Sequence, residues 1–281
     1  SQLGLLMCLK ILFSPGDKVW IEDPQYPLLR AATKTHDIVP VYVPVDNEGF
    51  NLQTALALEP NAKGVFLTPS HQCPLGILMS IQRRRNILQW ASESGGWIVE
   101  DDYDSELRYG GNLAYPSLQG MDSGNNVIYV GTFSKSLFPG LRLSYMVVPE
   151  ELVKPFSGMR FLIDRQSNEI LQMAVAEFIK TGLYETHLLK MRRIFEARRD
   201  YLIQAVQENF GNWGKFIATG QGMHLTFVFN NSDINDEAVA DLCRRQGVEL
   251  RSISSFSIGT PLYKGLIMGF GHFPPAQLLA A

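Results

Sequence analysis

The sequence predicts an α/β fold with a large, mostly parallel sheet and a smaller C-terminal α/β domain. In the first half of the 281-residue chain, short β-rich runs alternate with helical runs. That alternation is typical of an open parallel sheet. After Pro149 the pattern changes to two long helical stretches and then a second, shorter set of strands. We therefore expect a large domain over 1–155, followed over 156–281 by connecting helices and a small C-terminal domain.

The expected elements follow from runs of apolar residues bounded by polar and turn-forming ones. The strands expected in the large sheet cover 18–22, 38–43, 64–68, 97–101, 127–130 and 143–148. Helical patterns lie between several of them, at 3–13, 26–35, 51–58 and 81–94. The second half should form helices over 152–180 and 185–210, a strand at 222–230, a helix at 236–246, and strands at 248–253 and 266–269. The arginine pairs 192–193 and 198–199 are interpreted as the solvated face of a long helix rather than a nucleic-acid contact.

Composition argues against several classes of function. Hydrophobic residues make up 46% of the chain and charged residues 19%, and the net charge of -3 offers no basic excess for nucleic acid or a membrane surface. The three cysteines form no CxxC pair, which argues for reduced thiols in a cytoplasm rather than zinc or disulfides. No apolar run reaches ~18 residues, so no membrane span is expected. Because the chain starts at Ser1 without an initiator Met, we expect a fragment of a longer protein.

Lys135 lies in the run GTFSKSLFPGLR, directly after the apolar strand expected at 127–130. An amine beside the hydroxyls of Thr132 and Ser134 suits a lysine that forms a Schiff base with an aldehyde cofactor. The alternative is an ordinary solvated lysine. Arg142 offers a planar fork for a phosphate, and the backbone N–H groups that open the first helix, at 1–4, could bind the same phosphate.

Polar residues also follow the strand expected at 97–101, where Asp101 and Tyr103 lie in the run EDDYD. Ligands of open α/β sheets bind at the carboxyl ends of the strands. A carboxylate there could pair with a protonated ring nitrogen, and a phenol could donate to a ring oxygen. A divalent-metal site and a solvated acidic turn are the open alternatives.

Two further strand ends carry a histidine and an aromatic residue. His71, in a proline- and glycine-rich loop after 64–68, is either a structural histidine or a ligand contact. Tyr26, between two prolines after 18–22, either stacks on a flat ring or packs on its own helix. A phosphate-bearing pyridine aldehyde would satisfy all four strand ends, whereas a metal would explain neither Lys135 nor Arg142.

The runs TPSHQCPLG, EDDYDSELRY and GTFSKSLFPGLRLSYMVVP resemble fold-type I pyridoxal-phosphate (PLP) proteins of the class I/II aminotransferase group. Within that group they look most like the aminotransferase-like domain of MocR-type regulators of the GntR class. The resemblance covers nearly the whole chain. It implies a PLP-binding, effector-sensing domain that forms a homodimer and reaches DNA only through an N-terminal winged-helix domain, which is expected before Ser1 and is absent from this sequence.

The resemblance also implies roles for single residues. Lys135 would hold PLP as an internal aldimine, Asp101 would pair with the pyridinium nitrogen, and Tyr103 would donate to the phenolic oxygen. Tyr26 would lie near the ring. The phosphate would be bound by Ser1, Gln2, Thr132, Ser134 and Arg142.

Two departures from the family's pattern bear on function. Cys73 stands before Pro74, where active aminotransferases usually carry an Asn that contacts the phenolic oxygen. The last expected strand, 266–269, contains no arginine to clamp a substrate carboxylate, and Arg251 on the preceding strand could take that role. Both departures favour a sensor, in which an amino acid or other small amino compound exchanges with Lys135 to form an external aldimine. The alternative is a free-standing aminotransferase, and weak or partial transamination stays open; a metal-dependent hydrolase on the acidic run is the third class.

Overall fold

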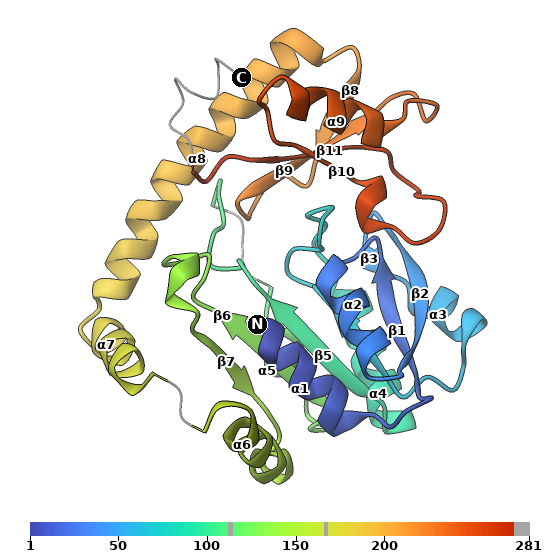
Figure 1. Ribbon diagram of the computed structural model, residues 1–281, viewed down its shortest axis with the longest axis vertical. Coiled ribbons are helices and arrows are strands. Elements are labelled where there is room, and N and C mark those ends of the chain that lie inside the picture. The colour runs from blue at the N-terminus through green and yellow to red at the C-terminus, as the bar shows by residue number, and fades with distance from the viewer. Residues whose placement is uncertain (112–114, 166–167, 273–281) are drawn as a thin grey trace.

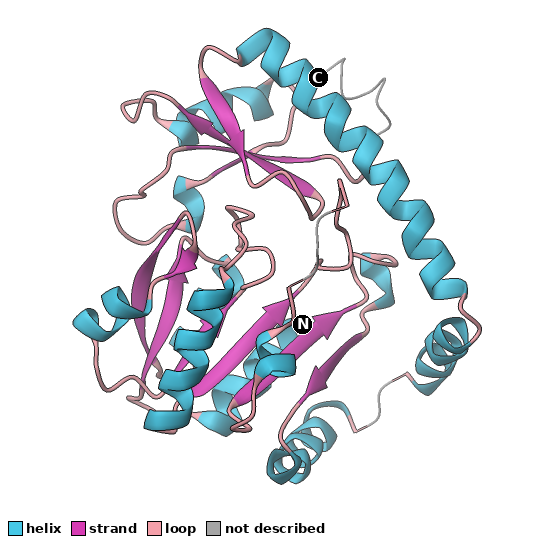
Figure 2. Ribbon diagram, turned by 180° about the vertical axis from the view of Figure 1, so that it is seen from behind, coloured by secondary structure: helices cyan, strands magenta, loops and turns pink. Residues whose placement is uncertain are grey.

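A computed structural model describes residues 1–111, 115–165 and 168–272, and it divides into two domains. The large domain, in blue and green at the bottom of Figure 1, contains one sheet covered by helices on both faces. The small domain, in orange and red at the top, contains the second sheet, and the long helix α8 joins the two along one side (Figures 1 and 2). The predicted α/β fold with a smaller C-terminal domain is confirmed.

The large sheet has seven strands in the order β3-β2-β1-β4-β5-β6-β7. Their bounds are β1 Lys18–Asp23, β2 Val39–Asp46, β3 Gly49–Phe50, β4 Gly64–Leu67, β5 Trp97–Asp102, β6 Val127–Thr132 and β7 Ser144–Val147. The five central strands are parallel, and only the edge strands β3 and β7 run antiparallel to their neighbours. The carboxyl ends of β1, β4, β5 and β6 therefore meet at one edge of the sheet, as the sequence predicted.

Two hydrophobic cores cover the two faces of this sheet. The helices of the domain are α1 Gln2–Leu12, α2 Pro27–Thr35, α3 Leu52–Leu58, α4 Ile81–Ser94 and α5 Leu118–Met121. Helix α1 buries Leu5 and Leu9 against Val99 of β5 and Val130 of β6. On the other face, α4 buries residues such as Ile87 against Ile98 of β5. Successive residues of a strand point to opposite faces, so these two cores fix the direction of each later β5 side chain.

The second half of the chain forms long helices and a four-stranded antiparallel sheet in the order β10-β11-β9-β8. Its elements are α6 Glu150–Asp164, α7 Glu169–Lys180, α8 Leu183–Phe210, β8 Gly214–Ile217, β9 His224–Phe229, α9 Asp236–Arg245, β10 Arg251–Ser252 and β11 Gly265–Gly269. The prediction of one helix over 152–180 is wrong. Asn168 starts a new helix there, because its side chain accepts a hydrogen bond from Leu171 N (3.1 Å). The strand expected at 248–253 shortens to Arg251–Ser252.

A segment of the large domain's sequence lies in the core of the small domain. Leu107 and Tyr109 pack in one buried cluster with Phe227 and Phe270. The Tyr109 hydroxyl donates to Gly222 O (2.6 Å). We call residues 104–109 the strap. A division at residue 155 therefore describes the order of the sequence only. The core of the small domain also includes residues that come before position 155.

Two arginines of α8, Arg192 and Arg199, contact the strap, and Arg198 contacts another segment. Arg192 Nε donates to Glu106 O (2.6 Å), and the Arg199 guanidinium lies 4.8 Å from the centre of the Tyr109 ring. Arg198 donates to Gly271 O. The interpretation of these pairs as a solvated face is wrong for these three residues and holds for the exposed Arg193. Among the described residues, no helix combines the length and apolar character that a membrane crossing requires.

Candidate functional site

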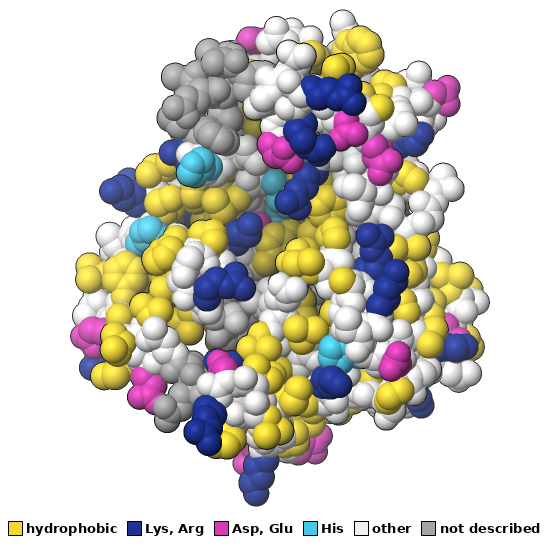
Figure 3. Space-filling model, viewed as in Figure 1, with side chains coloured by type: hydrophobic (Ala, Val, Ile, Leu, Met, Phe, Trp, Pro, Cys, Tyr) yellow, Lys and Arg dark blue, Asp and Glu magenta, His cyan; other side chains and the backbone are white. Residues whose placement is uncertain are grey.

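The candidate site lies where the carboxyl ends of the central strands meet the small domain. Helix α1 starts beside the ends of β5 and β6 (Figures 1 and 2). The space-filling view shows Lys and Arg side chains along the line where the two domains meet (Figure 3). The predicted site residues come to this region from four strand ends, the start of α1 and the small sheet.

Asp101 faces α1, because Val99, two residues earlier in β5, lies in the α1 core. Its Oδ1 is buried and makes no hydrogen bond among the described residues. Burial raises the pKa of this carboxyl to about 7; the amino terminus at Ser1 and a hydrogen bond from Ser1 oppose the rise, whereas Asp102 and Asp104 add to it. A buried carboxylate oxygen without a donor is costly, so this position fits a ligand that brings a proton or a positive charge.

Asp102 points to the opposite face and has its own partners. Its carboxylate accepts from the Tyr129 hydroxyl (2.9 Å) and from Ser105 N (3.1 Å). It lines a separate hollow with Arg108 and Tyr145. The acidic run therefore does not gather its carboxylates around one point, as the metal alternative requires.

Tyr103 contacts His71, which lies in the loop that follows β4. The Tyr103 hydroxyl donates to His71 O (2.8 Å), and burial raises its pKa well above the usual value. The His71 ring is 2% exposed, with Nδ1 2.9 Å from Asp104 Oδ1. The His71 ring is therefore enclosed by the protein, and its contact with an effector stays a prediction.

His71, Asp104 and His224 are the described residues whose ligand atoms come close enough to invite a metal, within 4.8 Å of one another. The 2.9 Å between His71 Nδ1 and Asp104 Oδ1 is a hydrogen-bond distance. Two ligands of one tetrahedral zinc ion, each bonded at about 2.0–2.1 Å, would stand roughly 3.4 Å apart. His224 Nε2 already bonds to Pro74 O (2.9 Å). This group is therefore a hydrogen-bonded cluster.

The lysine segment begins where β6 ends. Ser134 N donates to Thr132 Oγ1 (3.2 Å), and the Thr132 hydroxyl donates to Ser134 Oγ (3.0 Å). Lys135 is exposed. Arg142 follows a short 3-10 turn and adopts a left-handed backbone (φ 51°), a conformation uncommon outside glycine. The segment thus presents two hydroxyls, an amine and a guanidinium at the end of β6.

The charges of Lys135 and Asp101 both act on the Cys73 thiol. Burial raises the pKa of Cys73 above its usual range, Asp101 and Glu22 raise it further, and Lys135 opposes them. The Cys73 thiol is therefore neutral, at the position where the resemblance implies an amide. The charges of Lys135 and Asp101 are thus both felt at Cys73.

Tyr26 follows β1 and packs against the core cluster that contains α1. It precedes the first turn of α2. Burial raises the pKa of its hydroxyl, Asp101 and Cys73 add to the rise, and Arg142 and Arg251 oppose it. The charges of the large-domain and small-domain arginines therefore act on the same phenol.

Arg251 lies directly opposite Ile267 in the β10–β11 pair, so both side chains leave the same face of the small sheet. Ile267 packs against the cluster that contains Leu75 and Val45 of the large domain. Arg251 is exposed, and within the described part of the chain its guanidinium makes no hydrogen bond or ion pair. A charged fork without a partner thus faces the large domain.

The sequence reasoning missed the residue that holds the loop after β4. Glu22 is 4% exposed, and its Oε2 accepts from both Thr68 N (3.0 Å) and the Thr68 hydroxyl (2.6 Å). The Thr68 oxygen in turn accepts from Cys73 N (3.0 Å). Burial raises the pKa of Glu22 to about 7. The sequence does contain a sign of this role, because Glu22 directly follows the apolar residues of the strand VWIED, where a carboxylate needs a buried partner.

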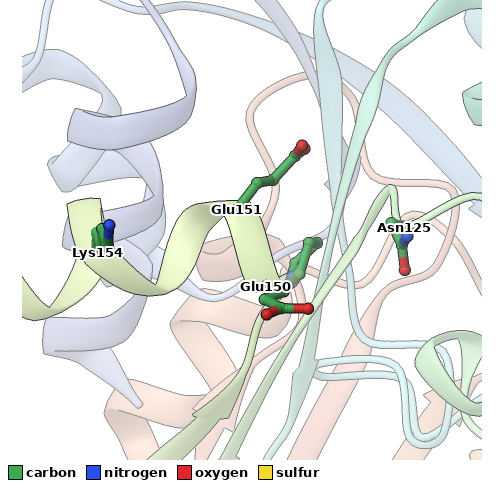
Figure 4. Close-up of a pocket in the computed structure, with 5 residues that line it drawn as sticks. Asn125, Glu150, Glu151 and Lys154 are labelled. Atoms are coloured by element: carbon green, nitrogen blue, oxygen red, sulfur yellow. The ribbon is translucent and has the colours of Figure 1, made fainter.

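A shallow depression lined by Asn125, Pro149, Glu150, Glu151 and Lys154 is shown in Figure 4. Asn125 precedes β6 and Pro149 follows the antiparallel β7. The depression therefore lies at the opposite edge of the sheet from the strand ends, and it takes no part in the candidate site.

Comparisons with known proteins agree with this geometry. The family "Aminotransferase class I and II" matches residues 2–265. The uncharacterized HTH-type transcriptional regulator YdeL of Bacillus subtilis is 36% identical over 95% of this chain and 57% of its own length. The probable rhizopine catabolism regulatory protein MocR of Rhizobium meliloti is 34% identical over 99% of this chain and 56% of its own. The chain thus spans a little over half the length of these regulators.

Solved structures share the fold as well. Kynurenine aminotransferase of Pyrococcus horikoshii, solved with PMP, aligns with a TM-score of 0.91 and 25% identity over 99% of this chain and 70% of its own. The match therefore includes both domains. The chain belongs to the class I and II aminotransferase family.

Proposed function

We propose that this chain is the PLP-binding, effector-sensing domain of a MocR-type transcriptional regulator. The observation that carries the proposal is the buried, unpartnered Asp101 oxygen at the end of β5, in the same neighbourhood as Lys135. Pyridoxal phosphate is the cofactor of this family. When bound, it supplies an aldehyde and an electron-withdrawing pyridinium ring.

The surrounding residues would hold the cofactor by charge and hydrogen bonding. Asp101 would hold a proton on the ring nitrogen, and that N–H would give its unpartnered oxygen a charge-assisted donor. Lys135 would be the point of covalent attachment, because its amine can condense with the aldehyde that the cofactor supplies. The phosphate would be held by Arg142, by the hydroxyls of Thr132 and Ser134, and by the backbone N–H groups at the start of α1, where Ser1 and Gln2 lie.

The departures at two positions support a sensor over an aminotransferase, which stays the alternative. Cys73 offers a neutral thiol, a weak donor, where an amide would hold the phenolic oxygen. Arg251 would bind the carboxylate of an amino acid effector while the effector's amine displaces Lys135. A clamp reaching across from β10 would still orient the effector, but it comes from a different strand than in the family's enzymes.

The surface and the relatives support the expected partners. Leu162 of α6 and Ile170 of α7 are each 81% exposed, and Met173 is 72% exposed. Apolar side chains on this scale usually lie in an interface, so a homodimer formed through α6 and α7 is proposed. DNA would be bound by the separate domain that the helix-turn-helix relatives carry. The free cysteines fit a cytoplasmic location.

Cofactor attachment is tested by borohydride reduction of the PLP-loaded protein and mapping of the labelled peptide. Lys135 should carry the label, and Lys135→Ala should abolish it. Lys154→Ala, at the opposite edge of the sheet, is the matched control and should behave as the unaltered protein. A label elsewhere, or none, would reject the proposal.

The effector class is tested by absorbance on the loaded protein, with L-alanine and ethylamine as probes. Arg251→Met should weaken L-alanine binding by about 10-fold or more and leave ethylamine unchanged, because only the former has a carboxylate. Arg193→Met on exposed α8 is the control. A complex with L-alanine that forms and persists supports the sensor, whereas full conversion to the pyridoxamine form supports the aminotransferase.

A further inference from the structure

The His71 ring lies in a cavity that the backbone shapes closely around it. Gly76 and Gly222 form two of its walls, and both have positive φ angles (76° and 80°). A Cβ on Gly222 would lie 2.0 Å from His71 Cε1, and one on Gly76 would lie 2.9 Å from His71 Nε2. The positive φ angles already favour glycine at both positions. The absence of side chains there also lets the backbone approach the ring on two sides, which limits the orientations that the ring can adopt.

Asp104 fixes which nitrogen of this ring carries the proton. Asp104 is 1% exposed, and both carboxylate oxygens lie near His71 Nδ1, at 2.9 and 3.1 Å. A carboxylate only accepts hydrogen bonds, so Nδ1 donates to it. His71 Nε2 is buried and has no hydrogen-bond partner among the described residues.

This proton placement decides what the Tyr103 hydroxyl can do. The hydroxyl oxygen lies 3.1 Å from His71 Nδ1 and 2.8 Å from His71 O. Since Nδ1 holds its proton toward Asp104, it offers no lone pair to the phenol. The Tyr103 hydroxyl can therefore donate its proton only to the His71 carbonyl oxygen, a weaker acceptor than a ring nitrogen, or to a ligand. The two rings pack with centroids 5.7 Å apart.

We propose that His71 and Asp104 are a positioning pair that keeps the Tyr103 proton available to the cofactor's phenolic oxygen. The inference rests on the proposed function. Neither residue touches the cofactor in this role, and His71 is thereby reassigned from effector contact to support of Tyr103. Among the described residues, the titratable groups that face His71 are Asp104, Tyr103 and His224. The centroids of the His71 and His224 rings lie 4.9 Å apart, and burial lowers the pKa of His224 to about 4.

The test is the pH midpoint of the absorbance change of the PLP-loaded protein. A phenol that donates a hydrogen bond to the anionic ring oxygen reduces the attraction of that oxygen for the proton on the adjacent Lys135 nitrogen. That proton is then lost at a lower pH. Tyr103→Phe should therefore raise the midpoint by about one unit. Asp104→Asn, which keeps the size of the side chain, populates the tautomer with a lone pair on Nδ1 and should raise the midpoint in the same direction. In the Tyr103→Phe background it should add no further rise.

The sign separates this role from a simple electrostatic one. Removing the Asp104 charge through space would lower the midpoint, because a nearby carboxylate favours the protonated form. His71→Asn, which retains an N–H toward Asp104 and offers the phenol no ring nitrogen, should keep the midpoint near the original value. A lowered or unchanged midpoint in Asp104→Asn overturns the proposal, as does an unchanged midpoint in Tyr103→Phe. Failure of the unaltered protein to bind PLP at all would instead refute the proposed function.

Discussion

Replacing Asp101 by Asn should have opposite effects on two properties of the protein. In the cofactor-free state, the ionised carboxylate is buried with an oxygen that lacks a donor, so its removal should stabilise the fold at pH 8. In the loaded state, the same carboxylate pairs with the ring nitrogen, so its removal should weaken PLP binding. No purely structural role of Asp101 predicts that combination.

The size of each effect follows from the site. Burial raises the pKa of Asp101 from 3.8 to about 7. Each unit corresponds to about 1.4 kcal/mol, so ionisation costs the folded, cofactor-free protein at most about 4 kcal/mol at pH 8. That cost is full above pH 7, decreases as the pH falls toward 4, and vanishes once the unfolded chain is protonated too. Loss of a hydrogen bond to a charged group, about 1.5–3 kcal/mol, should weaken PLP binding roughly 10- to 150-fold.

The assays are urea unfolding of the cofactor-free protein at pH 8 and pH 5, and absorbance titration with PLP. Asp101→Asn should raise the free energy of unfolding at pH 8 and raise it much less at pH 5. Asp102→Asn is the matched control, because that carboxylate already accepts two hydrogen bonds on the opposite face. The control should lower the free energy of unfolding by about 1–3 kcal/mol. A loss of stability in Asp101→Asn at pH 8, or unchanged PLP affinity, would refute the reasoning.

Three further predictions concern the packing between and around the domains. Gly222→Ala should lower the free energy of unfolding, measured with urea, by about 3 kcal/mol or more, because a Cβ would overlap the His71 ring. The control is Gly247→Ala, where φ is 88° and nothing lies near the added Cβ. It should lower the free energy of unfolding by only about 1 kcal/mol. Tyr109→Phe should cost about 1 kcal/mol by the same assay, through the lost bond to Gly222 O, and an unchanged urea midpoint would contradict that value. Ile170→Glu should shift the protein to monomers in sedimentation, and a persisting dimer would exclude α7 from the interface.

Much of the site could be predicted from sequence because it depends on strand ends. Parallel strands align their carboxyl ends, so polar residues after β1, β4, β5 and β6 had to meet at one edge. The alternating direction of β5 side chains then separates Asp101 from Asp102, which a one-dimensional acidic run cannot show. The sequence also does not reveal the register between β10 and β11, which places Arg251 opposite Ile267.

The rest depended on contacts between segments far apart in the chain. His71 meets His224 of β9 across the domain boundary, and no local pattern signals a partner so distant in sequence. The arginines of α8 look solvated in any helical projection, because their carbonyl acceptors lie on other segments. The break before α7 was readable in principle, since Asn168 is a favourable helix cap.

The strap has a consequence for how this domain can be divided or recombined. The sheet of β8 to β11 and helix α9 lie together late in the sequence, yet two side chains of their core, Leu107 and Tyr109, are encoded before β6. A fragment starting at α8 would leave Phe227 and Phe270 without these neighbours. The small domain therefore cannot be exchanged between relatives as one continuous segment of sequence. A chimera that replaces the small domain must also replace residues 104–109.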